Sequence, residues 1–215
     1  MTLPRYPGYD VLMKRDTPSW DDVTREVIDE RLATPKEPRF FDAVQWKAMC
    51  ALCECIVPQD VTREPVPLPE LLDAKLMKGV GDGYRDARLP SMPDAWRIGL
   101  AALDAESRAR HDGLPFASID VNARHALVQD MQHGKIHDEA WQRMPPDLFF
   151  KERVLHDICG AYYSHPHAWS EIGFGGPANP RGYVRMVFDR RDPWEAAEAA
   201  PGHEQEAQKE NRRVR

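Results

Sequence analysis

Prolines divide this sequence into segments, and their placement restricts the possible folds more than any other feature. The chain has 19 prolines among 215 residues, about 9%, whereas the usual share is about 5%. Proline lacks the backbone N–H that helix interiors and central strands need, so it is found mostly where such elements begin or end. Most of the prolines lie outside the segments that have helical apolar spacing. We therefore expect helices joined by many irregular connections.

Apolar residues recur at helical spacing over six segments between these breaks. In the first segment, Val23, Val27, Ile28 and Leu32 form one predicted inward stripe. No segment shows the alternating pattern of a half-buried strand, and the sequence has no βαβ unit or internal repeat. The sequence therefore predicts an all-α protein, an irregular bundle of about five or six helices. The expected helices span residues 20–32, 40–57, 68–77, 94–111, 118–133 and 145–163.

The two ends of the chain depart from this helical pattern. Three prolines within residues 1–18 predict an extended arm. After Ser164 the sequence becomes rich in glycine and proline, and we expect no regular element there. The last residues are charged and rich in alanine, which predicts a frayed helix or a disordered tail over residues 195–215. The expected organisation is an arm with a short helix over residues 1–39, a helical domain over 40–188 and a charged tail over 189–215.

Both flanking segments carry aromatic and aliphatic side chains that no predicted helix buries. Contiguous exposed apolar side chains often mark a site of interaction with another protein. In the alternative interpretation, both segments fold back onto the chain's own helices. The first interpretation is favoured. The residues expected at a partner interface are Tyr6, Tyr9, Trp169, Ile172, Phe174 and Tyr183.

Charge and hydropathy exclude two classes of function. The chain has 35 acidic and 29 basic side chains, a net charge of −6, and no basic stripe, so nucleic-acid binding is not expected. No window approaches the roughly 18 apolar residues of a membrane helix, so no membrane insertion is expected. The first residues also lack the apolar core and cleavage site of a signal peptide. We expect either a cytoplasmic protein or a periplasmic one that is exported bound to a partner.

One cysteine cluster and two histidines are candidates for chemistry. Cys50 and Cys53 have the C-x-x-C spacing of zinc or iron–sulfur ligands, with Cys55 close by. On a helix, however, Cys55 points about 140° away from Cys50. Buried thiols between helices are the favoured alternative. His165 and His167 are expected to form hydrogen bonds or to line an interface rather than to hold a metal.

No motif in the sequence supplies a catalytic site. The glycine runs at residues 79–83 and 173–176 follow no predicted strand, so turns are favoured over phosphate-binding loops. A serine nucleophile elbow and a Walker A motif are absent from the sequence. We therefore expect no catalytic residue and no cofactor on this chain.

Five segments occur in an order that is typical of a known family. They are the helix from Trp46 to Asp60 that ends in Ile-Val-Pro-Gln-Asp, the Gly99–Leu103 segment, Leu114-Pro-Phe116 followed by Leu127, the segment from Phe149 to Pro166, and Trp169-Ser-Glu-Ile-Gly-Phe-Gly-Gly-Pro177. In this order they resemble the gluconate 2-dehydrogenase subunit 3 family, over roughly residues 40–185.

The resemblance implies a non-catalytic auxiliary subunit that binds and stabilises a large partner, as a chaperone does. That partner would be an FAD-dependent dehydrogenase of the glucose–methanol–choline type. It would hold the FAD, oxidise a sugar or sugar acid, and pass electrons to a cytochrome c or another acceptor. Two other interpretations stay open. One is a self-sufficient metal-binding helical protein built on Cys50 and Cys53, and the other is an interaction module unrelated to redox chemistry.

Overall fold

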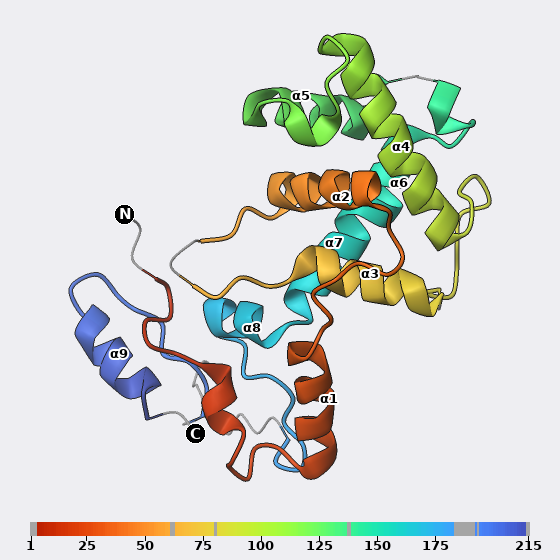
Figure 1. Ribbon diagram of the computed structural model, residues 1–215. Helices are drawn as coiled ribbons and strands as arrows, with labels where there is room; N and C mark the ends of the chain where they lie inside the picture. The colour runs from red at the N-terminus through yellow and green to blue at the C-terminus, as the bar shows by residue number, and fades with distance from the viewer. Residues whose placement is uncertain are drawn as a thin grey trace. The chain divides into compact units, whose positions relative to one another are not determined.

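The structure is a computed structural model that describes residues 4–60, 63–79, 81–136, 139–182, 192 and 194–213 (Figure 1). Within these ranges the regular elements are helices, and a single isolated β-bridge joins Trp20 to Asn179. The all-α prediction is confirmed, although this part of the chain forms more helices than the expected five or six. None of the helices described is long and apolar enough to cross a membrane.

Contacts divide the chain into two compact units. Unit 1 comprises Met1–Ala33, Glu64–Val66 and Tyr163–Arg215, and unit 2 comprises Thr34–Arg63 and Pro67–Tyr162. Unit 1 therefore combines the two ends of the chain, whereas unit 2 is formed by the middle. The expected boundary between residues 188 and 189 falls inside unit 1.

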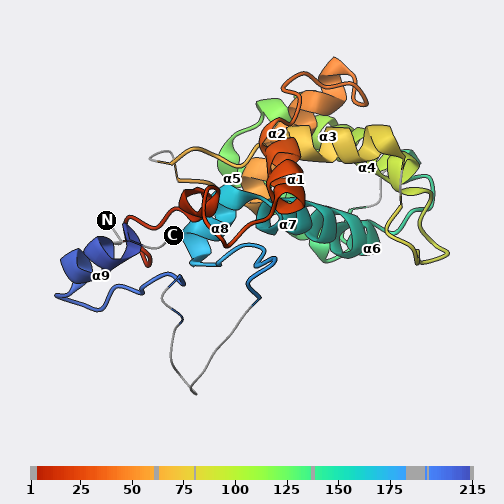
Figure 2. The same cartoon turned by 90° about the horizontal axis from the view of Figure 1, so that it is seen from below.

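Unit 2 contains the long helices that apolar spacing predicts. Side-chain caps begin several of them, because Asp42, Ser91 and Asp120 each accept hydrogen bonds from the first free backbone N–H groups. One continuous helix runs from Pro146 to Tyr163, and its middle turns, Phe150–Leu155, are π-helical (Figure 2). The elements are α2 (Ala43–Ile56), α3 (Leu68–Lys78), α4 (Met92–Arg110), α5 (Val121–Gln132), and α6 (Pro146–Phe149), which continues through the π segment Phe150–Leu155 into α7 (His156–Tyr163).

The core of unit 2 forms around α4. Trp96 and Leu100 are fully buried there, and Trp96 meets Phe149 edge to face with ring centroids 5.4 Å apart. Gly99 allows this approach, because a Cβ at that position would overlap the ring of Phe149. A small residue in the middle of α4 therefore sets the spacing between α4 and α6.

Unit 1 is built from short elements around an aromatic cluster. They are a 3-10 turn (Val11–Lys14), α1 (Asp22–Leu32), α8 (Pro166–Ile172) and α9 (Glu204–Asn211). The expectation of no regular element after Ser164 is wrong for α8. His165 caps this helix and Pro166 occupies its first turn, a position that tolerates proline. The buried cluster consists of Tyr9, Val11, Trp20, Ile28, Trp169 and Ala196.

The α1 helix buries a different face from the predicted one. Ile28 is buried as expected, but Val23 is 67% exposed, and Val27 and Leu32 are also exposed. Arg25 helps to set this rotation, because its guanidinium donates to the carbonyls of Arg15 and Trp20. The predicted stripe is therefore wrong in all but Ile28, since backbone contacts of a long polar side chain compete with apolar burial.

Part of the C-terminal tail is anchored to the N-terminal arm. Asn211, at the end of α9, donates from its amide to the carbonyls of Pro7 and Ala197, at 3.0 and 2.9 Å. Its amide oxygen accepts from the Ala197 N–H, and Arg5 pairs with Glu198. Both views show α9 beside the arm (Figures 1 and 2). A buried asparagine thus joins the two ends of the chain.

Candidate functional site

The residues expected at a partner interface have different environments. Tyr9 and Trp169 are buried in the unit 1 cluster, so they contribute to this chain's own core. Tyr6 is partly buried against the same cluster. Ile172 and Phe174 are each 42% exposed. Tyr183 lies outside the described residues. The arm and the C-terminal segment therefore fold against each other, and Ile172 and Phe174 are left as the accessible apolar pair of this set.

The end of α8 positions this accessible pair. Gly173 ends the helix in a left-handed conformation with φ +71°, and a Cβ there would lie 2.6 Å from the ring of Tyr6. The Phe174 N–H donates to the Trp169 carbonyl at 2.9 Å, and the two rings meet edge to face at 5.7 Å. Glycine is therefore required at residue 173 both by the backbone and by the close approach of the arm.

Lys14 is a fully buried base in unit 1. Its ammonium group donates to the carbonyl of Gly175 at 3.1 Å and lies 5.7 Å from the centroid of the Tyr9 ring. Burial first, and then the charge of Arg181, lower the pKa of Lys14 to about 8, and Glu195 opposes this shift. The side chain holds the Gly175 backbone against the arm, and it is inaccessible as a nucleophile.

The cysteines of α2 are free thiols in environments that disfavour a thiolate. Cys53 is buried, and its thiol contacts the Met49 sulfur at 3.7 Å. Burial, followed by the charges of Glu70 and Glu54, raises the pKa of Cys50 to about 11, and the pKa of Cys53 is raised well above its usual value for the same main reason. A metal at Cys50 and Cys53 would have to displace protons that these surroundings retain.

Unit 2 places a second set of metal-ligand types together. Single ligand atoms of Asp82, His156 and Asp157 lie within 4.8 Å of one another, the one such group in the part of the chain described. The Asp157 carboxylate is completely buried and accepts from the Trp96 indole N–H at 2.8 Å. Two carboxylates and an imidazole are suitable ligands for a divalent cation, so the neighbouring charges decide what this group does.

Two cations already neutralise these carboxylates. Lys75 contacts Asp82 at 2.9 Å and Asp157 at 3.2 Å, and Arg153 lies 3.5 and 3.6 Å from the same two side chains. Burial alone would raise the pKa of Asp82, but the Lys75 hydrogen bond and Arg153 hold it below its usual value. A divalent ion here would meet two fixed positive charges. The arrangement is best described as a closed ion-pair network that joins α3, α4 and α7.

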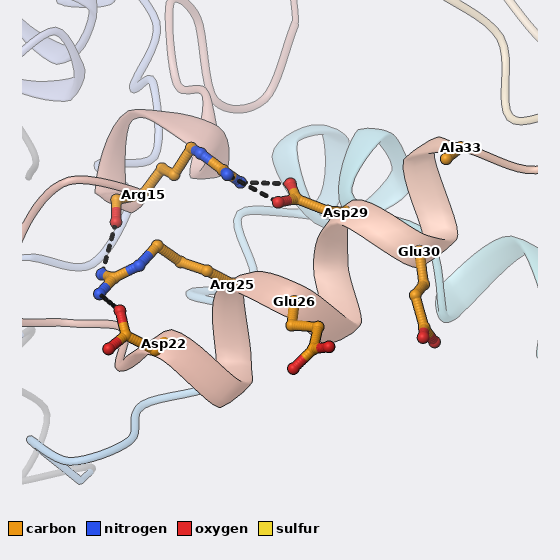
Figure 3. Close-up of a pocket in the computed structure, with 7 residues that line it drawn as sticks. All are labelled: Arg15, Asp22, Arg25, Glu26, Asp29, Glu30 and Ala33. Carbon is orange, nitrogen blue, oxygen red and sulfur yellow. Dashed lines mark hydrogen bonds and ion pairs between the residues drawn. The ribbon is translucent and has the colours of Figure 1, made fainter.

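A hollow beside α1 is lined mainly by charged side chains (Figure 3). Arg15 forms a two-pronged ion pair with Asp29, which lowers the pKa of that carboxyl group, and Arg25 pairs with Asp22. Figure 3 shows Glu26 and Glu30 pointing away from Arg15. The arginines in this hollow are thus already paired, and the hollow offers no convergent set of free groups.

The sequence patterns did not predict the surroundings of several titratable residues. The pairing of Lys75 with Asp157 joins positions 82 residues apart, and no local pattern indicates it. Lys14 lies in the predicted extended arm, where no pattern indicates a buried base. The start of α8 does have a sequence signal, because a polar residue directly before a proline is typical of a helix start. His165-Pro166 fits that signal.

Comparison with known proteins addresses the identity of this fold. The family model described as gluconate 2-dehydrogenase subunit 3 matches residues 43–176, which include α2 to α8. The comparison with curated proteins gave no match, and neither did the comparison with solved structures. The family match covers more than half of the chain and agrees with the five ordered sequence segments. The chain belongs to the gluconate 2-dehydrogenase subunit 3 family.

Proposed function

We propose that this chain is a non-catalytic small subunit that binds and stabilises an FAD-dependent dehydrogenase of the glucose–methanol–choline type. In this proposal the partner holds the FAD and oxidises a sugar or sugar acid. Its electrons pass to a cytochrome c or another acceptor. The observation that carries the proposal is the family match over residues 43–176, since that family is described as a dehydrogenase subunit.

The surroundings of the titratable groups support a binding role. A general acid, base or nucleophile needs access to a substrate and a suitable pKa. The candidates in the described residues have other roles: Asp157 is buried in an ion-pair network, the thiols of Cys50 and Cys53 are held protonated, and Lys14 is inaccessible. These side chains stabilise the chain's own fold.

The accessible apolar pair supplies a contact surface for the partner. Ile172 and Phe174 flank Gly173 at the end of α8, and each keeps 42% of its surface exposed. The Phe174 ring is supported from one side by Trp169, so it loses little freedom when another protein covers it. Large aromatic side chains with such support are typical energetic centres of protein interfaces.

The proposal is tested by purifying the tagged full-length chain from cells that produce it naturally. We expect a flavoprotein to co-purify, with flavin absorbance and sugar or sugar-acid dehydrogenase activity in the complex. The chain produced alone should bind no flavin. Tight FAD binding by the isolated chain, or purification without any flavoprotein, would contradict the proposed function.

The contact surface is tested separately with Phe174→Ala. If Phe174 is a central contact, its truncation costs about 2 kcal/mol of binding free energy, or roughly 30-fold in affinity. Leu114→Ala is the matched control, because Leu114 is similarly exposed but lies in unit 2. If both variants bind the flavoprotein like the unmodified chain, the function stands and the contact surface lies elsewhere.

A further inference from the structure

Protonation would break the hydrogen bond that begins α8. His165 is the cap of this helix and is 2% exposed. Its Nδ1 accepts a hydrogen bond from the backbone N–H of His167 at 3.3 Å. A protonated imidazole carries a hydrogen on both ring nitrogens and can accept no hydrogen bond. In the cation, Nδ1–H would face another donor, and the cap would be lost.

The neighbouring imidazole, that of His167, does not compensate a positive charge on His165. Its Nδ1 atom is buried and has no hydrogen-bond partner in the described part of the chain. The rings of His165 and His167 also meet edge to face, with centroids 4.6 Å apart, so two positive charges here would repel.

The charged groups around the two imidazoles do little to stabilise a positive charge on His165. Arg31 of α1 donates to the Ser164 carbonyl at 2.8 Å, which places a permanent cation beside α8. The carboxylate of Glu64 lies 3.8 Å from His167 Nε2, but its side chain is 82% exposed, and such pairs contribute little. Burial first, then His167 and Arg31, lower the pKa of His165 to about 4.

We propose that His165 forms an acid-sensitive switch that keeps the first turn of α8 folded while its ring is neutral and releases this turn when the ring is protonated. The same turn controls the aromatic cluster of unit 1. The Trp169 N–H donates to the His165 carbonyl at 3.2 Å, and the Trp169 indole donates to the Tyr163 carbonyl at 2.6 Å. Release of this turn therefore loosens the packing of Trp169 in unit 1.

The direction of the pH effect follows from proton binding. Because folding lowers the pKa of His165, the unfolded turn binds more protons than the folded turn between about pH 6.5 and pH 4. The stability that neutral His165 contributes is fully present above this window. It is lost as the pH falls through it, so acid opens α8.

Hydrogen–deuterium exchange of the full chain between pH 7 and pH 4, corrected for intrinsic exchange rates, tests the switch. Protection of residues 164–176 should fall by about 20-fold from pH 7 to pH 5, while residues 92–110 of α4 keep theirs. His165→Asn should remove this fall, because asparagine caps helices well and does not titrate. His203→Gln is the matched control, since His203 is an exposed imidazole of the same unit, and it should behave like the unmodified chain. Equal losses in His165→Asn and the unmodified chain would overturn the proposal.

A second measurement does not depend on the folding of a variant. The Cε1 proton of His165, followed by NMR in the unmodified chain, should titrate far below pH 6.5, at the lower end of the pH window over which α8 loses protection. Titration near pH 6.5 in the folded protein would overturn the switch.

Discussion

Unit 1 and unit 2 differ in how well their buried charged groups are compensated by neighbouring groups. In unit 2 the buried carboxylates meet fixed donors: Asp73 accepts from the backbone N–H groups of residues 39–41 at 2.8 to 3.0 Å, and Asp157 accepts from Trp96 and Lys75. In unit 1 the buried bases Lys14 and His165 contact mainly backbone atoms. A compensated buried charge stabilises one conformation, whereas a poorly compensated base makes stability depend on pH.

The largest expected effect comes from Trp169→Ala in unit 1. Trp169 is 4% exposed in the aromatic cluster, and truncation of such a side chain typically costs about 4 kcal/mol. Exchange protection throughout unit 1 should fall, with unit 2 as the internal reference. Phe174→Ala should cost far less, because that ring is already partly in water. Similar losses for the two variants would show that Trp169 is not the centre of the core.

Asp157→Asn tests the compensated network of unit 2. The change removes a buried charge that faces Lys75 and Arg153, and breaking such a network should cost about 3 kcal/mol in the free energy of unfolding. Asp130→Asn is the control, since the Arg110–Asp130 pair is substantially solvent-accessible and should contribute about 1 kcal/mol or less. Denaturant unfolding followed by circular dichroism measures both. If the two costs were alike, the buried network would have no special role.

Lys14 should make the stability of unit 1 depend on pH in the alkaline range. Its pKa is lowered to about 8 in the folded chain from 10.5, so the unfolded state binds more protons between these values. Stability should therefore rise with pH across this window, by about 3 kcal/mol. Lys14→Met should flatten the rise in unit 1 protection. An unchanged slope in the variant would assign the pH dependence to another group.

Gly99→Ala should produce the smallest of these losses. A Cβ at Gly99 would overlap the Phe149 ring, and overpacking of this kind costs about 2 kcal/mol. Gly160→Ala is a matched control in α7, because a Cβ there meets nothing within 4 Å, and alanine is the better helix former by about 1 kcal/mol. Thermal unfolding should show opposite shifts for the two variants. Shifts in the same direction would mean that α4 and α6 can move apart freely.

The sequence predicted most of unit 2 and less of unit 1. Helices at 68–77 and 94–111 were expected close to their observed bounds, Leu68–Lys78 and Met92–Arg110, because a long amphipathic period and a capping residue are local signals. The sequence did not predict α8, because this helix has only seven residues and lies in a segment rich in glycine and proline. It is held by the burial of Trp169 and by a histidine cap, which the apolar period alone does not indicate.

The residues expected at a partner interface also show that local sequence signals do not determine tertiary contacts. Aromatic content marked Tyr9 and Trp169 as residues that need burial and suggested a partner interface, whereas the structure buries both of them within this chain. Composition cannot distinguish burial by a partner from burial by a distant part of the same chain. The structure places Tyr9 and Trp169 in one cluster and leaves Ile172 and Phe174 accessible, so the candidate surface is smaller than the sequence suggested.

The sequence by itself determined the all-α class, the positions of the long helices and the family, because helical spacing, proline breaks and ordered motifs are properties of neighbouring residues. Only the tertiary structure decided that the two ends of the chain form one unit and that Asn211 joins α9 to Pro7. It also decided that Lys75 neutralises Asp157 and that an imidazole caps α8. These contacts join residues far apart in the sequence or depend on burial, and burial is set by the packing of the whole unit.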